Sequence, residues 1–178
     1  MILSDTKILE CIEKGDIVVT PFDPINMGGN SYDVHLSKYL AQYIDEQIDA
    51  KKHNEIRHFE IPPEGFVLLP GQLYLGATEE YTESHKHVPF LEGKSSTGRL
   101  GIDIHATAGK GDVGFCGYWT LEISSSKPVR IYAGMPIGQL IYYTVDGHVE
   151  RLYGTKKNAK YADQAHLPKE SMMWKNQF

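Results

Sequence analysis

The chain has 178 residues, of which 23% are charged and 41% hydrophobic, and its formal net charge is −5. This length and composition are typical of one soluble globular domain with its own core. The acidic balance argues against a protein that coats nucleic acid, because such proteins need a surplus of cations. No apolar run approaches the roughly 18 residues of a membrane span, and the N-terminus lacks a signal pattern. We therefore expect no membrane partner and a cytoplasmic location.

The first expected element is a short helix near the N-terminus. Ser4 or Asp5 can cap its start, and Gly15 can end it. Its apolar positions are Ile8, Leu9 and Ile12.

Short β-like runs, separated by proline and glycine, follow along the rest of the chain. The expected strands cover residues 17–19, 31–36, 66–69, 73–75, 100–104, 119–123, 129–132 and 139–145. Residues 78–88 are expected to form a further strand and a loop, and the charged residues 45–58 an exposed excursion. Many short strands with little helix predict an all-β barrel or sandwich. No repeat or linker divides the chain, so we expect a single domain over residues 1–178.

The stretch over residues 92–122 carries the most chemistry. Residues 94–99, KSSTGR, offer hydroxyls, a glycine and two cations, which suit the binding of phosphate. Residues 108–112, AGKGD, place an acid in a predicted turn. Further on, Glu122 alternates with the apolar residues Leu121 and Ile123, so it lies on the opposite face of the expected strand. Pattern alone allows either a solvated glutamate or a functional acid.

The order of these motifs resembles the dCTP deaminase family, whose members are relatives of trimeric dUTPases. The matching stretches are EGKSSTGRLG at 92–101, HATAG at 105–109, Asp112, and GYWTLE at 117–122. Further stretches that match in order are MILSD at 1–5, NSYDVHL at 30–36, GMPIGQL at 134–140 and AKY at 159–161. The resemblance covers nearly the whole chain. It implies a distorted jelly-roll-like β-barrel of the dUTPase-like type, assembled as a homotrimer with sites between subunits.

The C-terminal residues 151–178 are polar, and near their start Lys156, Lys157 and Lys160 are interleaved with Tyr153 and Tyr161. By composition this is a loosely ordered basic tail. The resemblance implies instead a flap that folds over bound nucleotide.

Deamination of cytosine needs water to attack C4, a proton on ring N3 and a proton for the departing ammonia. Zinc-dependent nucleobase deaminases use a His/Cys-x-Glu element and a Pro-Cys-x-x-Cys element. With only Cys11 and Cys116 present, the Pro-Cys-x-x-Cys element cannot be built here. His85 and His87 lack further ligands in the sequence and are interpreted as surface loop histidines. The chemistry is thus expected to be zinc-independent, and a carboxylate must move the protons. Glu122 matches the family's catalytic glutamate.

The resemblance also assigns the residues around this acid. Ser95 and Arg99 match residues that surround the attacking water and the catalytic carboxylate, although a turn hydroxyl and a structural ion pair are the alternatives. Lys94 stands where relatives commonly have arginine, so it keeps the charge but loses bidentate geometry. Asp33 is expected either to contact substrate or to pair locally. The other expected substrate-binding residues are Ser96, Thr97, Gly98, Lys110, Asp112, Thr120, Leu121, Tyr153, Lys160, Tyr161 and Gln164. Mg²⁺ is expected to arrive on the triphosphate, with no metal held by protein alone.

Three functions remain open at this point. The first is a dCTP deaminase that releases dUTP and ammonia, and the second is a bifunctional enzyme that gives dUMP and pyrophosphate. The third is a non-catalytic nucleotide sensor of the dUTPase fold. Within the turn at residues 108–112, Ala108 and Gly109 resemble the bifunctional and dUTPase pattern, but Lys110 keeps the cation of monofunctional members. Gly111 replaces the usual isoleucine and is expected to loosen the turn. We expect dUTP as the main product and dTTP as a feedback inhibitor.

Overall fold

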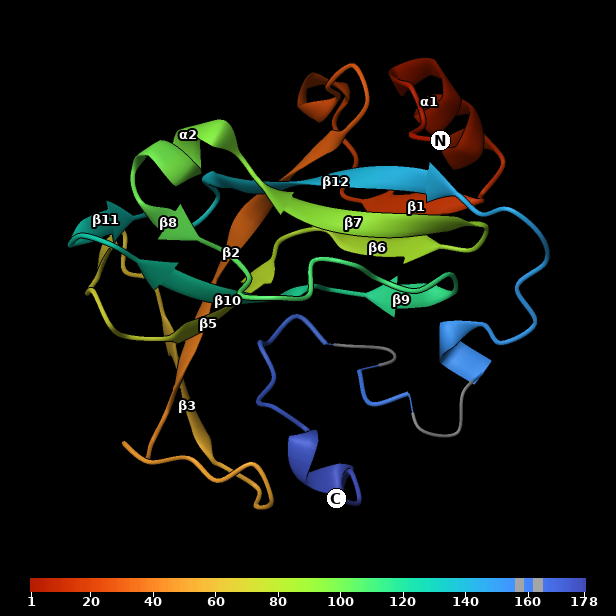
Figure 1. Ribbon diagram of the computed structural model, residues 1–178. Coiled ribbons are helices and arrows are strands. Elements are labelled where there is room, and N and C mark those ends of the chain that lie inside the picture. Colours follow the sequence, from red (N-terminus) through yellow and green to blue (C-terminus); the bar gives the residue numbers. More distant parts are fainter. Residues whose placement is uncertain (156–158, 162–164) are drawn as a thin grey trace.

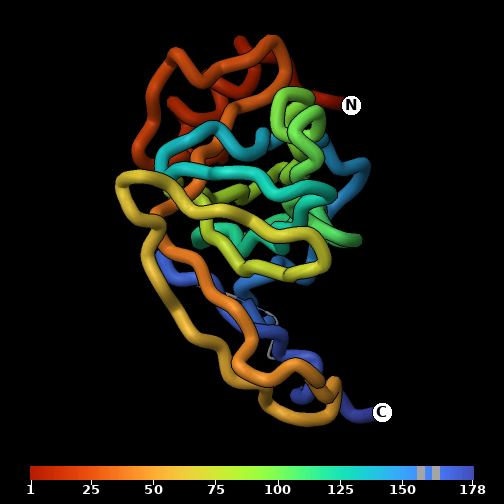
Figure 2. The backbone as a smooth tube through the Cα atoms, turned by 90° about the vertical axis from the view of Figure 1, so that its left-hand side faces the viewer, coloured from red at the N-terminus to blue at the C-terminus, as the bar shows by residue number. Residues whose placement is uncertain are grey.

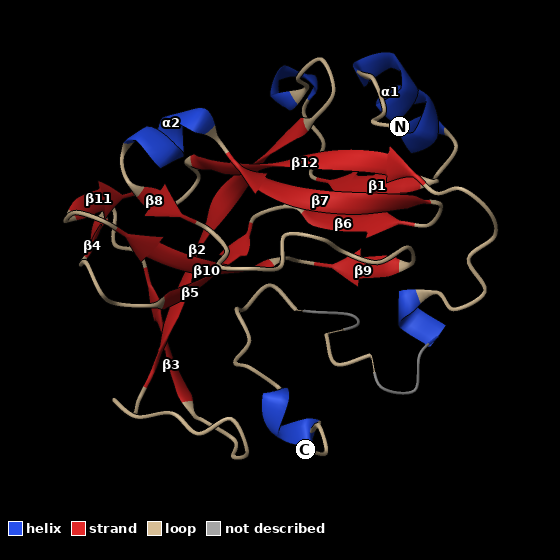
Figure 3. Ribbon diagram, viewed as in Figure 1, coloured by secondary structure: helices blue, strands red, loops and turns tan. Residues whose placement is uncertain are grey.

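The computed structural model describes residues 1–155, 159–161 and 165–178, and it consists mainly of β-strands (Figures 1 and 3). The strands are β1 (Ile17–Thr20), β2 (Tyr32–Tyr43), β3 (Ile56–Glu60), β4 (Phe66–Leu68), β5 (Tyr74–Thr78), β6 (Tyr81–Ser84), β7 (His87–Gly93), β8 (Ile102–Asp103), β9 (Phe115–Gly117), β10 (Thr120–Ser125), β11 (Val129–Ile131) and β12 (Pro136–Thr144). The helices are α1 (Asp5–Glu13) and α2 (Ser95–Arg99), with short 3-10 turns at Pro24–Asn26, Tyr153–Thr155 and Met173–Lys175. None of the helices described is long and apolar enough to cross a bilayer.

Three sheets build the body of the molecule. The largest has seven strands, in the order β7-β12-β2-β5-β10-β8, with β3 paired to β2. A three-stranded sheet follows the order β1-β6-β9, and β11 pairs with β4. Together they form a nearly closed barrel. The predicted all-β, dUTPase-like fold is therefore confirmed.

The N-terminal helix forms as its sequence predicts. The Ser4 side chain accepts a hydrogen bond from the backbone N–H of Lys7, which satisfies one of the donors left unpaired at a helix start. The chain leaves the helix at Gly15, whose positive φ of 71° suits glycine. Ile8 and Cys11 are buried, whereas Leu9, predicted as an apolar contact, is 38% exposed.

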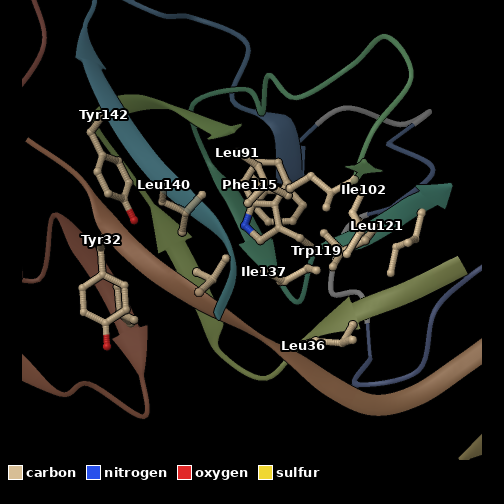
Figure 4. Packing of buried hydrophobic residues seen from close by; sticks show 14 of the residues in the cluster. Tyr32, Leu36, Leu91, Ile102, Phe115, Trp119, Leu121, Ile137, Leu140 and Tyr142 are labelled. Atoms are coloured by element: carbon tan, nitrogen blue, oxygen red, sulfur yellow. The ribbon is translucent and has the colours of Figure 1, made fainter. Parts of the chain in front are cut away.

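Strand β2 runs through the centre of the large sheet and extends well beyond the predicted end at residue 36. Its inward residues Tyr32, Val34, Leu36 and Leu40 are fully buried. They join side chains from β7, β10 and β12 in the core, among them Leu91, Leu121, Ile123, Ile137 and Leu140. Figure 4 shows this packing. Every second residue of β10 is buried, so packing holds this strand in place and sets which of its side chains face outward.

The end of β2 and strand β3 form a long hairpin that projects from the barrel. The loop at its tip and the first residues of β3 make up the predicted excursion at 45–58. Figure 2 shows the C-terminal segment running along this hairpin. Nε2 of His58 lies 2.9 Å from the backbone oxygen of Pro168, and Nε2 of His53 lies 3.0 Å from Oε1 of Glu170. The hairpin thus supports the chain's C-terminal segment.

Candidate active site

A cavity of about 550 Å³ lies between the barrel and the C-terminal segment. Its polar lining residues include Tyr43, Lys110, Asp112, Thr120, Glu122, Tyr153, Tyr161, Lys169, Glu170 and Ser171. Its apolar floor comes from Leu73, Leu75, Phe115 and Trp119. A space of this size, with an apolar floor and a few polar groups, is typical of a small-molecule site.

Glu122 enters the cavity from the middle of β10. Its neighbours Leu121 and Ile123 are fully buried on the core face, so the alternation of the strand turns the Glu122 side chain the other way. The predicted placement of Glu122 opposite the apolar set is confirmed. The backbone N–H of Ala106 donates to Oε2 of Glu122 at 3.1 Å. This bond orients the carboxylate.

The loop that carries Ala106 also brings Lys110 and Asp112 to the cavity. Two backbone hydrogen bonds hold this loop against β7. The Leu91 N–H donates to the Gly109 carbonyl oxygen at 2.7 Å, and the Gly111 N–H donates to the Pro89 carbonyl oxygen at 2.8 Å. Nζ of Lys110 donates to Oδ1 of Asp112 at 2.9 Å. The Lys110 ammonium is therefore held by the Asp112 carboxylate.

Gly111 is a point of close packing. A Cβ atom at this position would lie 2.7 Å from Cη2 of Trp119 and 2.9 Å from Cγ of Pro89. Both distances are too short for carbon atoms, so only glycine fits. The prediction that Gly111 loosens the turn is wrong, because the Trp119 ring fills the space that a side chain would take.

The C-terminal segment forms the outer wall of the cavity. The Lys169 N–H donates to Oγ1 of Thr120 at 3.3 Å, and the Ser171 N–H donates to the Tyr43 hydroxyl at 2.9 Å. Burial raises the pKa of Tyr43, although the Ser171 bond acts in the opposite direction. At this pKa the phenol stays protonated near neutral pH, so it keeps a proton to donate.

Two tyrosines connect the parts of this wall. The Tyr161 N–H donates to the Tyr153 hydroxyl at 3.1 Å, and the Met172 N–H donates to the Tyr161 hydroxyl at 2.9 Å. Lys160, also predicted, contacts the Asn176 side chain. Gln164, Lys156 and Lys157 lie outside the described residues.

Residues 94–99 lie apart from the cavity. Residues 95–99 form helix α2, and Arg99 donates to the Ser95 backbone oxygen at 3.2 Å. The Lys94 ammonium pairs with the Asp33 carboxylate, which is the local pairing expected as one alternative for Asp33. Thr97 is buried, and none of these six residues lines the cavity of Glu122. The other members of the helix, Ser95, Ser96, Gly98 and Arg99, are exposed.

Sequence reasoning missed several contributors to the cavity, among them Tyr43, Ala106, Lys169 and Glu170. Tyr43 ends a strand whose length was underestimated. Ala106 acts through its backbone, which composition cannot reveal. The contacts of Lys169 and Glu170 join segments far apart in the chain.

The comparisons with known proteins point to one family. A family model described as "dCTP deaminase-like" matches residues 2–145. A protein of Cytophaga hutchinsonii named "dCTP deaminase, dUMP-forming" is 48% identical over 161 residues, which cover 90% of each chain. A protein of Clostridium acetobutylicum with the same name is 52% identical over 151 residues, covering 85% of this chain and 87% of the relative.

A solved structure has the same fold. It is that of 2'-deoxycytidine 5'-triphosphate deaminase from Agrobacterium tumefaciens, with a TM-score of 0.64 at 20% identity. The match covers 81% of this chain and 48% of that one. From its sequence motifs, its barrel and these relatives, the chain belongs to the dCTP deaminase-like family.

Proposed function

We propose that the chain deaminates dCTP and then hydrolyses the resulting triphosphate, giving ammonia, dUMP and pyrophosphate. The observation that carries the deaminase proposal is the Glu122 carboxylate, held by the Ala106 N–H inside a cavity of about 550 Å³. The names of the relatives, "dCTP deaminase, dUMP-forming", favour the bifunctional alternative over our first expectation of dUTP.

The first step uses Glu122 as a proton shuttle. Its carboxylate accepts a proton from water as the water oxygen attacks C4 of cytosine. The proton passes to ring N3, and a second proton from the new hydroxyl reaches the amino group, which leaves as ammonia. The products of this step are dUTP and ammonia. Positioned acid–base catalysis of this kind contributes about 10²–10⁴-fold.

The second step would take place near Asp112. Water attacks the α-phosphorus of bound dUTP, and the bond to the β-phosphate oxygen breaks, releasing pyrophosphate and dUMP. In-line attack needs the reacting atoms about 3–3.5 Å apart. The structure offers two features that support such alignment: the loop of Asp112 is fastened to β7, and Lys110 holds the Asp112 side chain. Mg²⁺ would arrive on the triphosphate.

We also propose that the complete site lies between the subunits of a homotrimer. Ser95, Ser96, Gly98 and Arg99 carry the predicted phosphate and water contacts, yet they are exposed and lie outside their own chain's Glu122 cavity. A neighbouring copy would bring its α2 helix to this cavity. The C-terminal segment would act as the flap over bound nucleotide, and dTTP would compete for the same space.

The identity of the product tests this function. Purified protein is incubated with dCTP and Mg²⁺, and ammonia, pyrophosphate, dUTP and dUMP are followed over time. We expect one pyrophosphate with each ammonia, and no free dUTP before dUMP appears. Accumulation of dUTP in step with ammonia would show the monofunctional enzyme. Nucleotide binding without ammonia release would show a sensor.

A further inference from the structure

Three potential metal ligands gather on the barrel surface where β6 pairs with β9. The antiparallel register places Glu83 of β6 directly opposite Cys116 of β9. His85 follows Glu83 by two positions and so extends the same face, while Thr82 and Ser84, which alternate with them, are buried. The ligand atoms of Glu83, His85 and Cys116 all lie within 4.8 Å of one another. Figure 1 shows β6 and β9 side by side.

We propose that Glu83, His85 and Cys116 bind a zinc ion that joins β6 to β9. One sulfur, one imidazole nitrogen and one carboxylate oxygen form a ligand set that zinc accepts, and a water would complete the tetrahedron. The thiolate argues against Mg²⁺ and Ca²⁺, which prefer oxygen ligands only. A thiolate and a carboxylate together also balance the charge of a divalent ion.

The distances fit with small movements of the side chains. Metal–ligand bonds of about 2.0–2.3 Å in a tetrahedron place ligand atoms about 3.3–3.7 Å apart. Oε2 of Glu83 and Nε2 of His85 are 2.7 Å apart, so they would open slightly as the ion replaces the proton between them. The Cys116 sulfur would draw in and lose its proton. His85 is exposed, which leaves its ring room to turn.

Neighbouring groups hold two of the three ligands in place. The Tyr81 hydroxyl donates to Oε1 of Glu83 at 2.8 Å, which leaves Oε2 to face His85. The backbone N–H of His85 donates to the backbone carbonyl oxygen of Asp16 at 2.9 Å, which holds the chain in place just after β6. Outer contacts of this kind orient ligands in metal sites.

The site is distinct from the cavity of Glu122. Phe115 is buried and lines that cavity, whereas the next residue, Cys116, projects from the other face of β9. No step of the proposed deamination needs this ion. Its effect would be structural, because it would tie together two strands, one of which directly follows the loop of Asp112.

Metal binding to the full-length protein tests the proposal. Protein stripped with chelator and exchanged into chelator-free buffer is titrated with Zn²⁺ alone, and separately with Co²⁺ as a spectroscopic probe. We expect one ion per chain, a cobalt spectrum with a thiolate charge-transfer band, and a melting temperature that rises with zinc. Cys116→Ser and His85→Ala should each weaken binding at least about tenfold. Cys11→Ser and His53→Ala are the matched controls and should bind as wild type does.

Alkylation provides a second readout that does not depend on the variants folding. Cys11 is buried, and burial raises the pKa of its thiol, so it should react slowly with iodoacetamide at neutral pH. Cys116 is only partly buried and should react faster, and zinc should protect it at least about tenfold. Zinc binding that survives Cys116→Ser unchanged, or alkylation of Cys116 that zinc does not slow, would overturn the proposal.

Discussion

The backbone N–H of Ala106 donates to the side chain of Glu122 across 3.1 Å, and this bond joins the loop of Asp112 to the strand of the proposed acid. This hydrogen bond thus links the proposed site of deamination, at Glu122, to the proposed site of phosphate hydrolysis, at Asp112. The bond needs only an acceptor oxygen, so a glutamine at 122 could still make it through its amide oxygen. The position can therefore be altered without disturbing the loop.

Replacing Glu122 with glutamine removes the group that would carry the proton but keeps the size and hydrogen-bonding oxygen of the side chain. We expect Glu122→Gln to keep its melting temperature and bind dCTP with little change, while ammonia release falls by about 10²–10⁴-fold. The control is Glu13→Gln, which makes the same change at an exposed position of α1. A rate of ammonia release within about tenfold of wild type would rule out Glu122 as the shuttle.

Gly111 offers a test of close packing beside Asp112. Gly111→Ala would push a methyl group against Trp119 and Pro89, so we expect a loss of about 1–3 kcal/mol in the free energy of unfolding, measured by denaturant titration. Product formation should fall as well, since Asp112 is the next residue. Gly29→Ala is the matched control, because a Cβ there meets nothing within 4 Å. Equal stability of the two variants would contradict the packing argument.

Residue patterns predicted the barrel well because its strands are amphipathic or apolar over several residues. The alternation around Glu122 and the Ser4 cap depend on neighbours in sequence, and both were placed correctly. Helix α2 was missed because five residues that include Ser, Thr and Gly carry no helical periodicity. His87, interpreted as a surface loop residue, is instead buried at the start of β7, where burial lowers its pKa.

Long-range contacts account for the other differences. The pairing of Glu83 with Cys116 depends on strand register, which the local pattern does not encode. The tight fit of Gly111 depends on Trp119, a residue between β9 and β10. In both cases the residue types were visible in the sequence, but their partners were not.

Mixing two inactive variants tests whether sites are shared between subunits. Glu122→Gln lacks the proposed shuttle, and Arg99→Ala lacks a group expected from the neighbouring copy. Each variant alone should be inactive. After the two are unfolded and refolded together in equal amounts, about one quarter of all sites should combine an intact Glu122 with an intact Arg99.

The readout is ammonia release from the mixture, with size-exclusion chromatography to establish the assembly. The two variants refolded separately and then combined serve as the control and should remain inactive. Trimers that regain no activity would mean that both residues serve a site within one chain. A monomeric protein with full activity would contradict the shared site.

The contacts of the C-terminal segment decide where the chain can be shortened to test the flap. A cut after Gly147 would remove Tyr153, whose N–H donates to Val113 at 2.9 Å and whose ring packs against Phe115. Such a loss could disturb folding. Deleting residues 165–178 instead keeps Tyr153 and removes the outer wall of the cavity.

Without residues 165–178, the cavity loses the hydrogen bonds from Lys169 to Thr120, from Ser171 to Tyr43, and between Glu170 and His53. At about 0.5–1.5 kcal/mol each, these contacts hold the wall with roughly 1.5–4.5 kcal/mol. We expect the deletion to raise KM for dCTP at least about tenfold, and the loss of these contacts to lower the melting temperature. Removing only residues 177–178 is the control and should leave KM unchanged.

In the full-length protein, dCTP or dTTP should slow tryptic cleavage after Lys169, because a nucleotide beneath the flap favours its closed position. Cleavage at the same rate with and without nucleotide, together with an unchanged KM for the deletion, would show that the segment is not a flap.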